Sequence, residues 1–91
     1  MPRFLDVHTM PFNEEEWMEG AKELASQLPQ GFKRDRMYCN FSKGKFFCEW
    51  QCPSQKALEE AFRAGEVTFD EIHPVRLFDA AKEAWASGSR T

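Results

Sequence analysis

Two apolar, aromatic-rich runs of alternating pattern flank the dipeptide at 43–44, and they predict a β-hairpin. The second residue of this dipeptide is glycine, which adopts the positive φ of a tight turn without strain. A two-residue turn would pair Cys39 with Cys48 and Tyr38 with Glu49. Because strand side chains alternate, the hairpin has one apolar face and one mixed face. The apolar face carries Met37, Cys39, Phe41, Phe46, Cys48, Trp50 and Cys52, and the mixed face carries Arg36, Tyr38, Asn40, Phe47, Glu49 and Gln51.

Helical spacing of apolar residues predicts one helix before this hairpin and one after it. The first begins with a capping box, in which Asn13 is the N-cap and Glu16 follows three residues later. Phe12 and Trp17 occupy the positions of a hydrophobic staple. Ser54 is the expected N-cap of the second helix. The predicted buried stripes are Trp17, Ala21, Leu24, Ala25 and Leu28 in the first helix, and Ala57, Leu58, Ala61 and Phe62 in the second.

Alternation also predicts a first strand over Arg3–Thr9 and a last strand over Phe69–Val75, with Pro74 favouring a sheet edge. The element order β-α-β-β-α-β is that of the ferredoxin-like motif, an α+β sandwich with a four-stranded antiparallel sheet. Strands one and three are then central, and both helices cover one face of the sheet. We predict one domain over residues 1–91 with its core in 3–75, followed by an amphipathic C-terminal helix over 77–87.

The face of this sheet away from the helices is predicted to be polar and aromatic. In the first strand we place Leu5 and Val7 toward the helices, and Asp6 and His8 on the uncovered face. The uncovered face would then collect Phe4, Asp6, His8, Tyr38, Asn40, Phe47, Glu49, Gln51, Glu71 and His73. An aromatic face of this kind is usually covered, so we expect a homodimer, with the C-terminal helix as the alternative cover.

Composition narrows the classes of partner. The net charge of −3 opposes nucleic-acid binding, which needs a basic surface. No apolar run has the length of a membrane span, and the first residues lack the pattern of a signal peptide, so we expect no membrane and a cytoplasmic protein. The three cysteines form no secreted disulfide framework, and we expect them to be core thiols.

Asp6 and His8 are the candidate metal ligands, because residues two apart on a strand leave the same face. Glu49 and His73 are predicted on that face of neighbouring strands and complete a candidate ligand set. Imidazole and carboxylate ligands suit nickel or another divalent transition metal. The alternative is that these polar groups hydrogen-bond to one another at a wet dimer interface. Nucleophilic catalysis has little support, because no nucleophile elbow is present.

Three segments resemble a family of small bacterial nickel-binding proteins: FLDVH in the first strand, GKFFCEWQCPS from the third strand into the second helix, and DEIHPV in the last strand. The resemblance covers about residues 3 to 75 and implies a ferredoxin-like homodimer that binds nickel near the subunit interface. The ligands it implies in this chain are His8 and Asp6. The chain departs from the family in its second helix, where LEEAFRAGEV holds no histidine.

Metal homeostasis or sensing, without catalytic turnover, is therefore the function that the sequence favours. One rival is a dimeric α+β-barrel enzyme, such as a small monooxygenase or isomerase, which would hold an organic substrate between sheet and helices. A cavity beneath the helices would favour that rival, and a fully packed core of Trp17, Trp50 and Phe62 would oppose it. The other rival is a non-catalytic interaction module.

Overall fold

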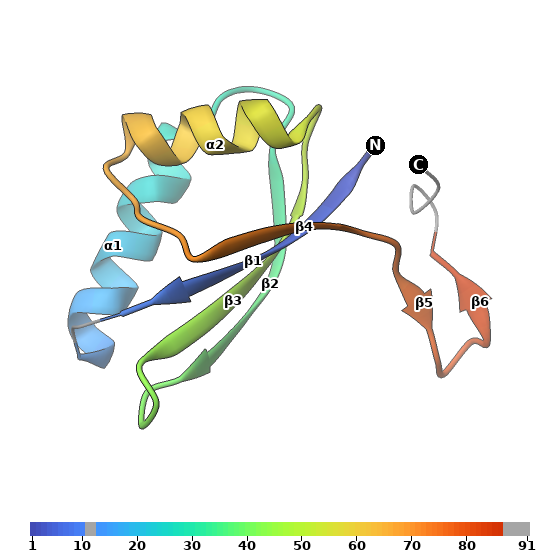
Figure 1. Cartoon of the computed structure of the whole chain (residues 1–91), viewed down its shortest axis with the longest axis horizontal. Coiled ribbons are helices and arrows are strands. Elements are labelled where there is room, and N and C mark those ends of the chain that lie inside the picture. Colours follow the sequence, from blue (N-terminus) through green and yellow to red (C-terminus); the bar gives the residue numbers. More distant parts are fainter. Residues whose placement is uncertain (11–12, 87–91) are drawn as a thin grey trace.

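The computed structural model describes residues 1–10 and 13–86 of the chain. Its first six elements follow the predicted order, and two short strands replace the predicted last helix (Figure 1). The elements are β1 (Arg3–Thr9), α1 (Glu14–Gln27), β2 (Lys33–Asn40), β3 (Lys45–Gln51), α2 (Gln55–Ala64), β4 (Glu71–Val75), β5 (Phe78–Asp79) and β6 (Ala84–Trp85).

Strands β1 to β4 form an antiparallel sheet in the order β2-β3-β1-β4. The first and third strands are central, as predicted, and β4, which contains Pro74, lies at an edge. An edge tolerates proline because one side of the strand needs no ladder donor. This α+β arrangement of four antiparallel strands and two helices is consistent with a ferredoxin-like fold.

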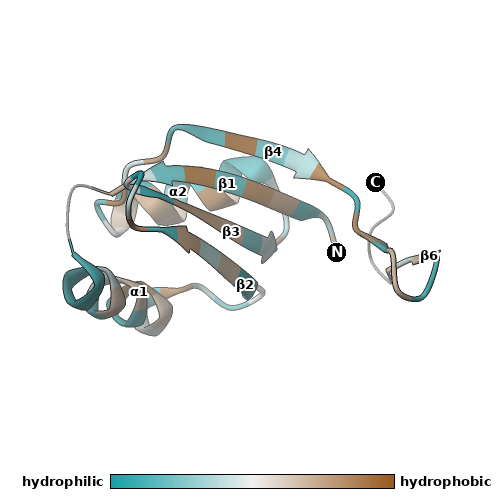
Figure 2. Cartoon of the chain, turned by 90° about the horizontal axis from the view of Figure 1, so that it is seen from below, coloured by the Kyte–Doolittle hydropathy of each residue, from teal (hydrophilic) through white to brown (hydrophobic). Residues whose placement is uncertain are grey.

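Both helices pack on one face of the sheet (Figure 2). From α2, Leu58 and Phe62 are fully buried against the sheet. From α1, Trp17 and Leu24 pack against the same core but stay partly exposed. The buried apolar residues are Phe4, Met10, Phe46, Cys48, Trp50, Cys52, Leu58, Ala61 and Phe62.

The β2–β3 hairpin has a longer turn than predicted. Its strands end at Asn40 and Lys45, so four residues connect them, and the side chain of Asn40 accepts the backbone N–H of Lys43 inside the turn. Cys48 pairs with Met37, where Cys39 was predicted. The register moves by two residues, which leaves the two faces of the hairpin unchanged. Cys39, predicted in the core, is exposed on the edge strand β2.

The predicted orientation of β1 is wrong. Asp6 and His8 face the helices, because they pair with Cys48 and Phe46 on the core side of β3. Leu5 pairs with Glu49 on the open face. The sequence pattern favoured the reverse, since it placed the two polar residues away from the core. Hydrogen bonds across the sheet compensate for burying them, and such bonds are not visible in a local pattern.

The predicted C-terminal helix is also wrong over the described residues 77–86, which form a β-hairpin standing apart from the sheet (Figure 1). Phe78 pairs with Trp85, and their rings meet edge to face at 5.2 Å. Asp79 accepts the backbone N–H groups of Ala81 and Lys82 and closes the turn. This aromatic pair and turn outweigh the helical spacing. Ser87, the predicted end of the helix, lies outside the described residues.

The beginning of α1 is as predicted. Asn13 accepts the backbone N–H of Glu16 at 2.9 Å, and the Glu16 carboxylate accepts the backbone N–H of Asn13. The staple partner Phe12 lies outside the described residues. No residue of α1 itself is fully buried, and Ala25 of the predicted stripe is exposed. The helix therefore lies less closely on the sheet than α2 does.

Gly20→Ala should stabilise the protein. Gly20 lies in the middle of α1, where a methyl group would meet no atom within 4 Å and would restrict the unfolded chain. We expect the free energy of unfolding, measured in urea, to rise by about 0.5–1 kcal/mol. Gly65→Ala is the matched control, because its methyl group would lie 3.0 Å from Leu24 Cδ1 and should give no comparable gain. Equal effects of the two substitutions would contradict this description of α1.

Candidate metal centre

Asp6 is a fully buried carboxylate at the centre of the sheet, with 0% of the residue exposed. Its Oδ1 accepts the backbone N–H of Cys48 at 3.0 Å, and its Oδ2 accepts the indole N–H of Trp50 at 2.7 Å. Two N–H donors from β3 therefore hold the carboxylate of β1 in a fixed orientation. A buried charge needs such partners, because removal from water costs several kcal/mol per ion.

His8 lies beside this carboxylate and is 1% exposed. Its ring stacks on Phe46 at 4.4 Å and meets the edge of Phe62 at 5.2 Å, so packing fixes its plane. The Nδ1 atom lies 2.7 Å from the backbone oxygen of Thr68. A carbonyl oxygen can only accept, so Nδ1 carries a proton and Nε2 is the atom available to a ligand.

Among the described residues, the Nε2 atom of His8 has no hydrogen-bond partner, although it lies 3.1 Å from Asp6 Oδ1. When the His8 ring is neutral and carries its proton on Nδ1, His8 Nε2 and Asp6 Oδ1 are both acceptors. Two acceptors 3.1 Å apart repel each other. A cation between them, either a proton or a metal ion, removes the repulsion.

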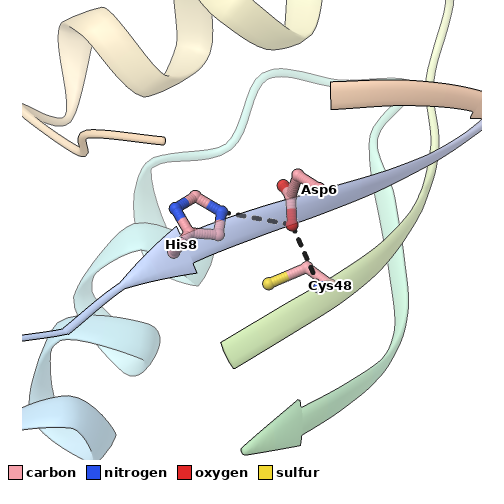
Figure 3. A group of neighbouring side chains, drawn as sticks. All are labelled: Asp6, His8 and Cys48. Atoms are coloured by element: carbon pink, nitrogen blue, oxygen red, sulfur yellow. Dashed lines mark hydrogen bonds and ion pairs between the residues drawn. The ribbon is translucent and has the colours of Figure 1, made fainter. Parts of the chain in front are cut away.

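Cys48 completes a buried three-residue group with Asp6 and His8 (Figure 3). One ligand atom from each residue lies within 4.8 Å of the other two. Burial, together with the neighbouring Asp6 carboxylate, raises the pKa of the Cys48 thiol far above its usual range. The free thiol is therefore protonated and a poor nucleophile, so a metal ion would have to displace its proton on binding.

The donors fit a transition metal ion. Imidazole, carboxylate and thiolate together suit nickel, zinc or copper better than magnesium or calcium, which prefer oxygen alone. Metal–ligand bonds of about 2.1 Å at right angles separate neighbouring donor atoms by about 3 Å. The 3.1 Å between His8 Nε2 and Asp6 Oδ1 is close to that separation. The Thr68 carbonyl also orients the imidazole as outer partners of metal-binding histidines do.

A pocket of about 440 Å³ lies between α1 and the sheet and reaches His8 and Cys48. It occupies the space that closer packing of α1 would have filled. Its walls include Trp17, Leu24, Arg34, Phe46, Trp50 and Phe62. Such a volume lies within the usual range for small-molecule sites. The condition that favours the organic-ligand alternative is therefore met, and the core is not fully packed beneath the helices.

Glu49 and His73, the other two predicted ligands, lie on the opposite face of the sheet. Both pair with Leu5 of β1, whose side chain points away from the helices. The Glu49 carboxylate accepts from Arg36 at 3.0 Å and from the Tyr38 hydroxyl at 3.3 Å, and His73 lies 3.2 Å from Glu71. The prediction of one four-residue cluster is therefore wrong, and the sheet separates it into two pairs.

Cys48 is the site residue that sequence reasoning missed. It was interpreted as a core thiol, which its burial confirms, but its position opposite Asp6 was not foreseen. The signal that could have found it is the position of Cys48 on the apolar face of the hairpin. Once β1 is oriented with Asp6 toward that face, Cys48 lies opposite Asp6.

Comparison with known proteins agrees with the resemblance noted in the sequence. Residues 4–75 match a family model described as nickel-responsive protein, SCO4226-like. The chain belongs to this family. Among solved structures, the chain is similar to the crystal structure of SCO4226 from Streptomyces coelicolor A3(2), with a TM-score of 0.70 and 22% identity. The alignment covers 82% of this chain and 96% of that chain and shows a shared fold. No curated protein matches the chain.

Within the described residues, no helix combines the length and apolar character needed to cross a membrane.

The cysteines should differ in reactivity because Cys39 is exposed, whereas Cys48 and Cys52 are buried. In metal-free native protein we expect one thiol to react with Ellman's reagent, and all three to react after denaturation. The native reaction should be slower than that of a free thiol, since partial burial and the nearby Glu14 raise the pKa of Cys39. Cys39→Ser should abolish it. Native labelling of Cys48 at the rate of Cys39 would contradict the buried cluster.

Proposed function

We propose that this protein binds a divalent transition metal ion, with nickel as the first candidate, through Asp6, His8 and Cys48. The observation that carries the proposal is the buried Nε2 of His8, which has no hydrogen-bond partner in the part of the chain that the structure describes and lies 3.1 Å from Asp6 Oδ1. The Cys48 thiol beside them supplies a third donor of a kind that nickel accepts.

The surroundings of the cluster support ion binding. Asp6, with 0% of the residue exposed, brings one negative charge into the core, and Cys48 would add a second on losing its proton. A divalent cation would balance these charges. The ring of His8 is already held by Thr68 and Phe46, so binding would require little reorganisation. Three protein ligands also leave coordination positions open toward the pocket.

The role we propose is metal homeostasis or sensing in the cytoplasm, where free thiols such as these three are maintained. The family description, nickel-responsive protein, supports this role. The protonated Cys48 thiol does not supply the activated nucleophile that covalent catalysis would need.

Calorimetric titration of tag-free, chelator-treated protein with nickel and zinc should show one high-affinity site per chain. His8→Gln should weaken nickel binding at least about 100-fold, because it removes the oriented imidazole. Cys48→Ser should keep the fold and abolish the near-ultraviolet charge-transfer band of a nickel–thiolate bond. His73→Gln is the matched control, since His73 lies on the other face of the sheet and should leave the affinity unchanged.

Two results would overturn the proposed site. One is nickel affinity no tighter than about millimolar in the wild type. The other is tight binding that His8→Gln and Cys48→Ser both leave unchanged while their thermal unfolding remains cooperative. A loss of binding in the control variant alone would move the site to the open face.

We also propose that the protein is a homodimer formed through the open face of the sheet and the C-terminal hairpin. The open face carries the partly buried apolar side chains of Leu5, Val7 and Phe47 between its charged pairs. The hairpin exposes Phe78 by 48% and Trp85 by 51% and extends beyond the sheet (Figure 1). Large exposed aromatic side chains of this kind are enriched at interfaces between subunits.

Sedimentation equilibrium should therefore show a dimer in solution. Replacing both hairpin aromatics, Phe78→Ser with Trp85→Ser, should raise the dimer dissociation constant at least about tenfold, because exposed aromatic anchors dominate interfaces. Met18→Ser, which removes an exposed apolar side chain from α1, is the control and should leave the dimer intact. A wild-type monomer at about 0.1 mM, or equal effects of both changes, would contradict the proposal.

A further inference from the structure

Arg34 is a cation at the wall of the pocket, and within residues 1–10 and 13–86 it has no carboxylate partner. It lies on β2 opposite Trp50, and its guanidinium lies over the Trp50 ring at 5.6 Å from the ring centre. One of its N–H groups donates to the backbone oxygen of Ala21 at 3.1 Å. Its neighbours Lys33 and Arg36 each have a carboxylate within ion-pair distance, whereas in the described part of the chain Arg34 has none.

Arg34 is also partly buried, so it is less compensated by water than a surface arginine. A half-buried guanidinium that faces a cavity is suited to a ligand carboxylate, because its N–H groups can donate to both oxygens. Glu23 and Glu66 also line the pocket, but both are exposed. Their charges are therefore solvated and screened, which weakens their repulsion of a ligand carboxylate.

The walls between Arg34 and the buried cluster are aromatic. Trp50 lies beside Arg34, and Phe46 lies four residues earlier on the same strand, next to His8. Four strand residues span about 13 Å, so the pocket is long enough for a fused ring system with a carboxylate at one end. Trp17 of α1 meets Phe46 edge to face at 5.8 Å and adds a further aromatic surface to the pocket.

We propose that this pocket binds a small aromatic carboxylate, with its carboxylate on the guanidinium of Arg34 and its rings between α1 and β3. An aromatic ligand suits this site, because its rings would stack on tryptophan and phenylalanine and would be removed from water. The proposal goes beyond metal binding and does not rest on it, since neither Arg34 nor the aromatic walls belong to the metal ligands.

The test uses naphthoate as the probe and its neutral analogue naphthamide for comparison. Both are titrated into chelator-treated full-length protein and followed by calorimetry and by the NMR signals of the tryptophan side chains. Arg34→Gln should weaken naphthoate binding about tenfold or more while leaving naphthamide binding unchanged. Arg36→Gln is the matched control, because Arg36 lies on the same strand but pairs with Glu49 on the open face.

A second variant keeps the test independent of the stability of Arg34→Gln. Gly20 lines the pocket, and a side chain added there meets open space. The large side chain of Gly20→Leu should therefore fill the pocket and block naphthoate binding. The single methyl group of Gly20→Ala should reduce naphthoate binding less. No naphthoate binding at about 5 mM, equal binding of naphthamide, or no loss in Arg34→Gln and Gly20→Leu would overturn the proposal. Titrating the same variants with nickel shows whether the metal site is intact, so a failure of naphthoate binding is distinguished from a failure of metal binding.

Discussion

The hydrogen bonding of the buried Asp6 carboxylate determines how the rest of the molecule is arranged. Its two oxygens accept from Cys48 and Trp50 of β3, 42 and 44 residues away in sequence. An unpaired carboxylate in this position would cost several kcal/mol, so β1 must present Asp6 to the core face and align with β3 at this register. The orientation of His8, two residues further on, follows from that alignment.

Local signals in the sequence were sufficient for most elements. The capping box at Asn13, the N-cap Ser54 and the edge strand with Pro74 are all found in the structure, because each depends on residues within a few positions. The orientation of β1 was not available from pattern alone. Phe4 on one face and Leu5 on the other are comparably apolar, and hydrogen bonds to a distant strand decide between them. At the C-terminus, the Phe78–Trp85 contact likewise outweighs local spacing.

The candidate site could be predicted in part for the same reason. Asp6 and His8 share a face by strand geometry alone, so their proximity was foreseen. Their grouping with Glu49 and His73 depended on the orientation of β1 and failed with it. Cys48 could be assigned only from the β1–β3 register, which no local pattern specifies. The partial packing of α1, which leaves the pocket, depends in turn on tertiary volumes that an apolar stripe does not report.

The uneven anchoring of the two helices has a consequence for dynamics. Helix α2 contributes Leu58 and Phe62 to the fully buried core, whereas α1 contributes no fully buried side chain. Local opening costs least where little apolar surface is lost, so α1 should detach at a lower free energy than the sheet and α2. Transient release of one helix would then widen the access to His8 that the pocket already provides, and the amide hydrogens of α1 would exchange without global unfolding of the domain.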